Sequence, residues 1–139
     1  MASTPLRYGT PITLDAARRV MAAAEAEAAR NQWPMVIAIV DTAGHLVMLH
    51  RMDQAQNGSI VIAPEKARTA VDFKRPTKVF QDAVAQGGVH LRLLGTPNAL
   101  PMEGGVPIIK DGEIVGGIGV SGMSSDQDAQ VAEAGLAAL

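Results

Sequence analysis

The first regular hydrophobic pattern in the chain is helical. Apolar residues recur at spacings of three and four from Leu14 to Ala28, with charged residues between them, which predicts an amphipathic helix over about 13–30. Thr13 can cap this helix through its hydroxyl, and Asp15 is favourably placed in the first turn. Because the apolar stripe is largely alanine, we expect another element to pack unusually close to it.

Two extended segments follow this helix. Residues 35–40 form a continuous apolar run, as expected of a central strand that is covered on both faces. After a turn at 41–44, the alternating segment 45–52 predicts the return strand of a hairpin. His50 falls on the apolar face of that strand, where a hydrogen-bonded core histidine is the usual outcome.

The middle of the chain predicts two further helices, over about 60–73 and 77–86, with Pro76 between them. Pro64 would be tolerated in the first of these only near its first turn. The segment 90–105, which contains two prolines and a glycine pair, reads as a long loop. Long loops inside compact domains are often functional.

The strongest local signal is the dipeptide Asp111-Gly112, which favours a two-residue type I′ hairpin between strands over 106–110 and 113–120. Aliphatic pairs and a complementary ion pair beside the turn agree with a single register. That register pairs Lys110 with Glu113, Ile109 with Ile114 and Ile108 with Val115.

Ser124 and Gln127 form a capping box at the start of a closing helix over about 125–138. The element order is therefore α-β-β-α-α-β-β-α. Because hairpins connect the strands, we expect an α/β (α+β) fold with an antiparallel sheet built from two hairpins and flanked by helices. No repeat, linker or low-complexity tract interrupts the sequence, so we expect one domain over residues 1–139.

The segment 117–122 matches the glycine pattern of a dinucleotide-binding turn. Only 17 residues follow Gly122, too few for the second strand and the acidic ribose ligand of such a unit. Instead, Gly117, Gly119 and Ser121 make one strand face nearly flat, so that a helix or a ligand can approach its backbone. The alanine-rich first helix is the expected neighbour of this face.

Composition excludes several function classes. With a net charge of −2 and aromatic residues at only 3%, the chain lacks the basic, aromatic surface of nucleic-acid binders. Without cysteine, it has no disulfide, thiolate nucleophile or cysteine metal site. The N-terminal sequence lacks the apolar stretch of a signal peptide and no run reaches membrane-spanning length, so we expect a cytoplasmic protein without a membrane or nucleic-acid partner.

Few residues carry candidate chemistry. The three histidines, at 45, 50 and 90, show no metal-ligand spacing, and we expect no metal site. His90 opens the long loop, where exposure favours a ligand role. Lys66 and Thr69 share one helix face, which is either a solvated side or part of a site. Glu103 is either an idle surface carboxylate or one that points into a site left open by Gly104 and Gly105.

Three segments together resemble the HbpS/GlcG family, which is described as haem-degrading or haem-binding. They are AIVDTAGHLV at 38–47 continuing to RMD at 51–53, KARTA at 66–70, and GGVPI at 104–108 continuing through Asp111-Gly112 to GGIGVSG at 116–122. Together with the helices they cover nearly the whole chain. The resemblance implies a profilin-like sheet flanked by helices and a homo-oligomer, often an octamer.

The resemblance also implies haem or a related small ligand near the KAxTA helix and the GGxP loop. On this sequence the implied ligand-binding residues are Lys66, Thr69, Gly104, Gly105 and Pro107. Family members accompany glycolate and diol catabolism and cobalamin-related enzymes, and others resemble lyases or isomerases. The Met102-Glu103 pair departs from the commoner apolar run of this loop, which favours a polar substrate.

Two functions from different classes fit these residues. A haem-binding protein needs an axial ligand, which His50, His90 or a methionine could supply. A cofactor-independent lyase or isomerase needs a carboxylate base and a cation for an anionic oxygen, and Glu103, Lys66 and Arg51 supply those types. An oligomeric accessory protein without chemistry of its own is a third possibility.

Overall fold

The computed structural model describes residues 5–139. The predicted order of helices and strands is confirmed, with a short N-terminal strand and a 3₁₀ helix in addition. The elements are β1 (Arg7–Tyr8), α1 (Leu14–Arg30), β2 (Val36–Val40), β3 (Leu46–Arg51), α2 (Ser59–Phe73), α3 (Lys78–Gln86), η1 (Gly88–Gly95), β4 (Gly105–Lys110), β5 (Glu113–Ser121) and α4 (Ser125–Leu136). No helix within 5–139 is long and apolar enough to cross a membrane.

The sheet is organised around β5, which pairs antiparallel with β4 and with β2, while β3 forms the outer edge beside β2. The sheet is mixed rather than purely antiparallel, because β1 pairs parallel with the start of β5. The prolines and the glycine of residues 1–12 predict an irregular N-terminal segment. Residues 1–4 lie outside the described residues, and within the rest Arg7 pairs with Glu113 as part of β1.

The predicted hairpin turn is confirmed, since Asp111 and Gly112 both have positive φ, 51° and 79°, as a type I′ turn requires. The first two predicted pairs, at Lys110 and Ile109, are also correct. The third is wrong: a bulge between Ile108 and Ile109 shifts the ladder, so that Ile108 lies opposite Gly116. Within residues 5–139 Lys110 and Glu113 lie opposite each other, but their side chains do not form the predicted ion pair.

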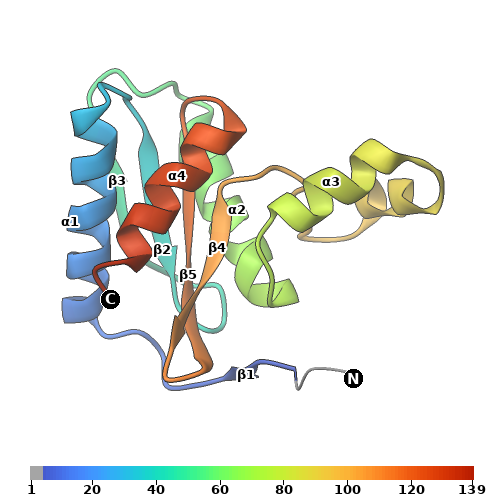
Figure 1. Ribbon diagram of the computed structural model, residues 1–139, viewed down its shortest axis with the longest axis horizontal. Coiled ribbons are helices and arrows are strands. Elements are labelled where there is room, and N and C mark those ends of the chain that lie inside the picture. The colour runs from blue at the N-terminus through green and yellow to red at the C-terminus, as the bar shows by residue number, and fades with distance from the viewer. Residues whose placement is uncertain (1–4) are drawn as a thin grey trace.

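Helix α2 covers one face of the sheet, and α1 and α4 cover the other (Figure 1). The flat face of β5, formed by Gly117, Gly119 and Ser121, packs against a helix as predicted. The helix is α2, however, and not the alanine-rich α1. A Cβ added to Gly119 would lie 2.0 Å from the Ala63 carbonyl oxygen, and one added to Gly117 would lie 2.7 Å from that of Ala67. The flat face therefore permits backbone-to-backbone packing by α2 and leaves no space there for a ligand.

The alanine stripe of α1 packs against α4 and the aliphatic face of the sheet. Thr13 caps α1 as predicted, with its hydroxyl oxygen accepting from Ala16 N at 3.1 Å. At the crossing of the two helices, a Cβ on Gly135 would lie 3.0 Å from the Val20 carbonyl oxygen. Small residues on both helices thus permit the close approach that the sequence predicts.

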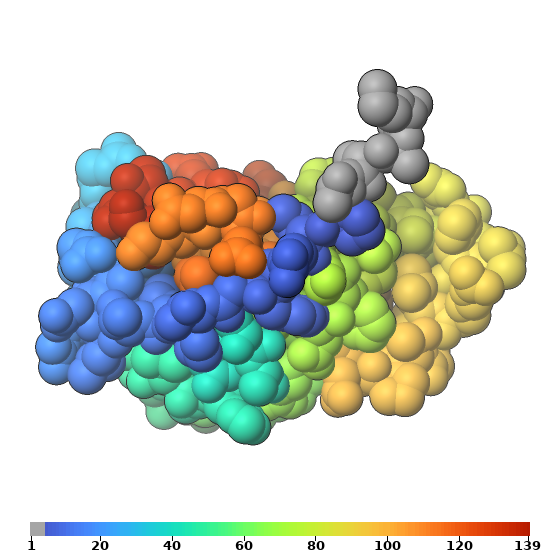
Figure 2. All heavy atoms as spheres, turned by 90° about the horizontal axis from the view of Figure 1, so that it is seen from below, coloured from blue at the N-terminus to red at the C-terminus, as the bar shows by residue number. Residues whose placement is uncertain are grey.

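An arm made of α3, η1 and the loop 96–103 projects from the body (Figures 1 and 2). The predicted long loop is therefore partly a 3₁₀ helix. Its apolar side chains at Val89, Leu91 and Leu94 are exposed. Pro64 lies in the second turn of α2, further into the helix than the sequence predicts.

Candidate functional site

Lys66 is completely buried under β5. Its ammonium donates to Asp128 Oδ2 at 2.9 Å and to the Val120 carbonyl oxygen at 3.0 Å. The other carboxylate oxygen of Asp128 accepts from Met123 N. Burial raises the pKa of Asp128, while the hydrogen bond and charge of Lys66 act to lower it. The pair ties α2, β5 and α4 together and presents no charge to solvent.

The glycine pair beside Lys66 is equally closed. A Cβ on Gly105 would lie 2.2 Å from the Lys66 carbonyl oxygen, and one on Gly104 would lie 2.8 Å from Lys66 Nζ. Gly104 also has a φ of 132°, which favours glycine. Pro107 is buried on β4. Atoms of Lys66 and its neighbours occupy the space beside Gly104 and Gly105. These glycines therefore form a close packing contact between α2 and β4.

Thr69 is a buried anchor for the loop that precedes β4. Its hydroxyl lies 3.0 Å from the Asn98 carbonyl oxygen and accepts from Leu100 N at 3.1 Å. The hydroxyl also lies 2.8 Å from the carbonyl oxygen of Glu65, one turn earlier in α2. Thr69 therefore positions the base of the arm.

Glu103 and His90 both belong to the arm. Glu103 is half-buried, and its backbone N–H donates to Gln81 Oε1 on α3 at 2.9 Å. His90 is half-buried on η1. A hydrogen bond from Lys78 to Asp82 raises the Lys78 pKa, with a smaller contribution from the charge of Glu103. The Glu103 carboxylate thus lies in the electrostatic surroundings of α3.

His50 lies on the outer strand β3 and not in the core. Its Nδ1 is 3.0 Å from Glu25 Oε1 on α1, and the two side chains are 47% and 43% exposed. The sequence predicts an apolar face, but β3 is the last strand of the sheet, so only part of that face is covered by α1. The next residue, Arg51, donates from Nη2 to Asn57 Oδ1 at 2.7 Å.

A groove of about 630 Å³ opens where the end of α1 meets the end of β3. We call it the Trp33 groove, after the only tryptophan in the chain. It is lined by Glu25, Ala29, Gln32, Trp33, Pro34, Arg51, Met52 and Asp53. Its volume falls within the usual range for small-molecule sites, and apolar and charged side chains meet in it.

The Trp33 groove contains one residue singled out from sequence, Arg51, and borders a second, because Glu25 also holds His50. Sequence reasoning missed Trp33 and Met52. The available signal was a lone tryptophan before Pro34, at the point where the first helix gives way to the central strand.

The structure does not bring Arg51 to the other two proposed catalytic residues. Arg51 ends β3 at one edge of the sheet, and Glu103 precedes β4 on the other side of β5. Lys66 is sealed between α2 and α4. Within residues 5–139 no group of three or more histidine or acidic side chains is arranged to hold a metal ion.

Comparison with known proteins places this geometry in a family. The model of the haem degrading protein HbpS-like family matches residues 12–137. Protein GlcG of Escherichia coli K12 is 42% identical over 105 residues, 76% of this chain and 77% of GlcG.

Two solved structures share the whole fold. The Klebsiella pneumoniae protein ORFY superposes with a TM-score of 0.88 at 30% identity, covering 99% of this chain and 97% of that one. A structure described as a PduOC:heme complex superposes with a TM-score of 0.85 at 32% identity, covering 94% and 96%. The chain belongs to the HbpS-like family.

Proposed function

We propose that this protein binds haem, or a closely related flat anionic ligand, in the Trp33 groove. The observation that carries the proposal is the meeting of Trp33, Met52 and Arg51 in one open groove of about 630 Å³. The family resemblance puts the ligand near the KAxTA helix and the GGxP loop, but these two segments are buried and packed closely against each other. The groove is larger than a second cavity of about 260 Å³, which is described below.

The groove residues match the chemistry of haem. The Trp33 ring and Pro34 offer apolar surface to a macrocycle, and the Arg51 guanidinium can bind a propionate carboxylate. Met52 supplies a thioether, which is an established axial ligand type. Bound haem would contribute redox and oxygen chemistry at its iron.

His50 is a second candidate ligand at the margin of the groove. Glu25 holds its Nδ1, which fixes the ring and leaves Nε2 as the nitrogen that faces away from that contact. A carboxylate partner also raises the basicity of a ligating imidazole. His90, the other histidine proposed from sequence, lies on the arm outside the residues that line the groove.

Relatives support a haem-type ligand. The family description is haem degrading, and the PduOC structure, at 32% identity, is described as a haem complex. The alternative of a cofactor-independent lyase or isomerase requires a base and a cation in one site. Because Arg51 lies at the far edge of the sheet from Glu103 and Lys66 is buried against Asp128, the observed geometry does not favour such a site.

An absorption titration with haemin tests the proposal. We expect a saturable Soret band in the wild-type protein, and a shifted band in whichever of His50→Ala, Met52→Leu and His90→Ala removes the axial ligand. Arg51→Gln should weaken binding about tenfold, because it removes a charge-assisted hydrogen bond. Arg18→Gln, an exposed arginine on α1 away from the groove, is the matched control.

The outcomes separate the possibilities. A shift in the His50 or Met52 variant supports the Trp33 groove, and a shift in the His90 variant alone places the ligand on the arm and contradicts the proposal. Absence of haemin binding by the folded wild-type protein would overturn it.

A further inference from the structure

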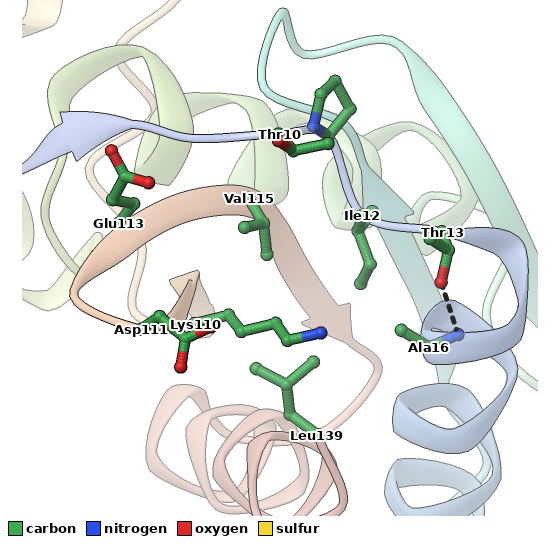
Figure 3. A pocket seen from close by; sticks show the side chains of 10 residues that line it. Thr10, Ile12, Thr13, Ala16, Lys110, Asp111, Glu113, Val115 and Leu139 are labelled. Carbon is green, nitrogen blue, oxygen red and sulfur yellow. Dashed lines mark hydrogen bonds between the residues drawn. The ribbon is translucent and has the colours of Figure 1, made fainter.

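A second cavity, of about 260 Å³, lies at the opposite end of the sheet from the loop that carries Glu103. It is a half-open cavity between the segment before α1, the first turn of α1, the turn of the β4–β5 hairpin and Leu139 (Figure 3). None of its residues lines the Trp33 groove. The cavity is lined by Thr10, Pro11, Ile12, Thr13, Ala16, Lys110, Asp111, Glu113, Val115 and Leu139.

One cation is directed into this cavity. Figure 3 shows the Lys110 side chain stretched across it, with the ammonium beside Leu139. The two carboxylates of the rim, on Asp111 and Glu113, point away from the ammonium in the same view. In the described chain Lys110 forms neither an ion pair nor a side-chain hydrogen bond, so its three donors are free for a ligand.

Two hydroxyls also line the cavity. Thr13 Oγ1 accepts from Ala16 N, which leaves its own hydrogen to donate. Thr10 lines the same wall, and its hydroxyl forms no hydrogen bond within residues 5–139. Figure 3 shows Thr10 on the wall opposite Lys110 and Thr13 at the first turn of α1, so the Lys110 ammonium is the group placed to bind an oxyanion and the hydroxyls add polar surface.

The floor of the cavity is apolar. Ile12, Ala16, Val115 and Leu139 present methyl groups to it, and Figure 3 shows these side chains pointing inward around the Lys110 ammonium. A bare inorganic anion would leave this surface in contact with water, whereas a short hydrocarbon would cover it. The volume lies below the usual range for drug-sized ligands, which limits the occupant to a small molecule.

We propose that this cavity is a binding site for a small organic monocarboxylate with a short apolar body. The carboxylate is held by the Lys110 ammonium, and the hydrocarbon rests on Ile12 and Val115. This site is separate from the Trp33 groove and is independent of haem binding.

Titrations of the ¹⁵N-labelled protein, followed by amide chemical shifts, test the site. Butanoate should give saturable shifts at Thr13, Val115 and Leu139, and should bind about tenfold more tightly than acetate because it buries two more methylenes. Butanamide, its neutral counterpart, should bind about tenfold more weakly than butanoate. Lys110→Gln should remove most of that preference for the charged ligand.

Lys78→Gln is the matched control, because it removes an exposed lysine on α3, away from the cavity. It should leave butanoate binding unchanged, and Lys110→Gln should leave the haemin titration unchanged. Equal binding of inorganic phosphate and butanoate, or of butanoate and butanamide, would contradict the assigned ligand class. Absence of saturable shifts at the cavity residues with butanoate would overturn the site, whatever the haemin result.

Discussion

Lys66 and Asp128 form an ion pair at 2.9 Å in which the side chains are 0% and 3% exposed. Removing one partner of such a pair leaves an uncompensated buried charge, which costs about 3–5 kcal/mol. We therefore expect Lys66→Met to lower the free energy of unfolding by about that amount in urea denaturation. The double variant Lys66→Met/Asp128→Leu should recover part of the loss. Arg18→Met, which breaks the exposed pair with Asp15, should change stability by less than about 1 kcal/mol.

Wild-type stability in Lys66→Met would contradict the structural role of the pair. It would also favour the ligand-binding role for Lys66 that its residue type and the family resemblance suggest.

The contact between β5 and α2 predicts a strict requirement for glycine. A Cβ at position 119 would lie 2.0 Å from the Ala63 carbonyl oxygen, and backbone atoms on both sides cannot move independently. Gly119→Ala should therefore destabilise the protein by about 3 kcal/mol, at the upper end of the usual overpacking cost. Gly95→Ala is the control, because a Cβ added at that position would have nothing within 4 Å of it. If thermal unfolding shows the two variants to be alike, the close packing of α2 on β5 is wrong.

A hydrogen bond from Gln130, together with Arg30, lowers the pKa of Glu27 below its ordinary value of 4.5. A lowered pKa in the folded state stabilises the protein above the unfolded value, and that stabilisation is lost as the pH falls through the folded value. The melting temperature of wild type should thus exceed that of Glu27→Gln above pH 4.5, and the two should converge in more acidic buffer. Glu133→Gln, on the exposed side of α4, is the control for loss of a surface carboxylate. A difference that persists unchanged in acid would contradict this assignment.

The arm exposes Val89 and Leu94 at 67% and 65%, with Leu91 at 48%. Several exposed apolar side chains on one projecting element favour burial against another molecule, and we propose that a second copy of the chain covers them. Light scattering should then give a mass that is a multiple of 14.5 kDa, and Leu94→Asp should reduce it. Val61→Asp, equally exposed on α2 at 66%, should not. A 14.5 kDa particle at micromolar concentration would contradict self-association.

Local signals account for the parts of the fold that the sequence predicts correctly. Thr13 caps α1 and the Asp111-Gly112 turn sets the hairpin, because each is decided by residues only a few positions apart. The features that were missed depend on distant partners. The parallel pairing of Arg7 with Glu113 has no signature in its own segment, and the glycines of β5 indicate a close approach without showing that α2 makes it.

In the candidate site, too, local signals could be read from the sequence and contacts between distant residues could not. Arg51 and His50 are recognisable by residue type, but the groove forms only when the end of α1 meets the end of β3. Trp33 and Met52 are ordinary core candidates until that contact exists. Lys66 shows the reverse case: its residue type suggests chemistry, but its partner Asp128 lies 62 positions away and converts it into a buried structural cation.

The most direct test of haem binding in the Trp33 groove is the NMR spectrum of the ¹⁵N-labelled protein with substoichiometric haemin. Ferric haem broadens the signals of nuclei near the iron, so we predict selective loss of the Trp33 indole signal and of the Met52 and Asp53 amides. The Val89 and Leu94 amides on the arm should stay sharp. Broadening centred on His90 and the arm, with a sharp Trp33 signal, would contradict haem binding in this groove.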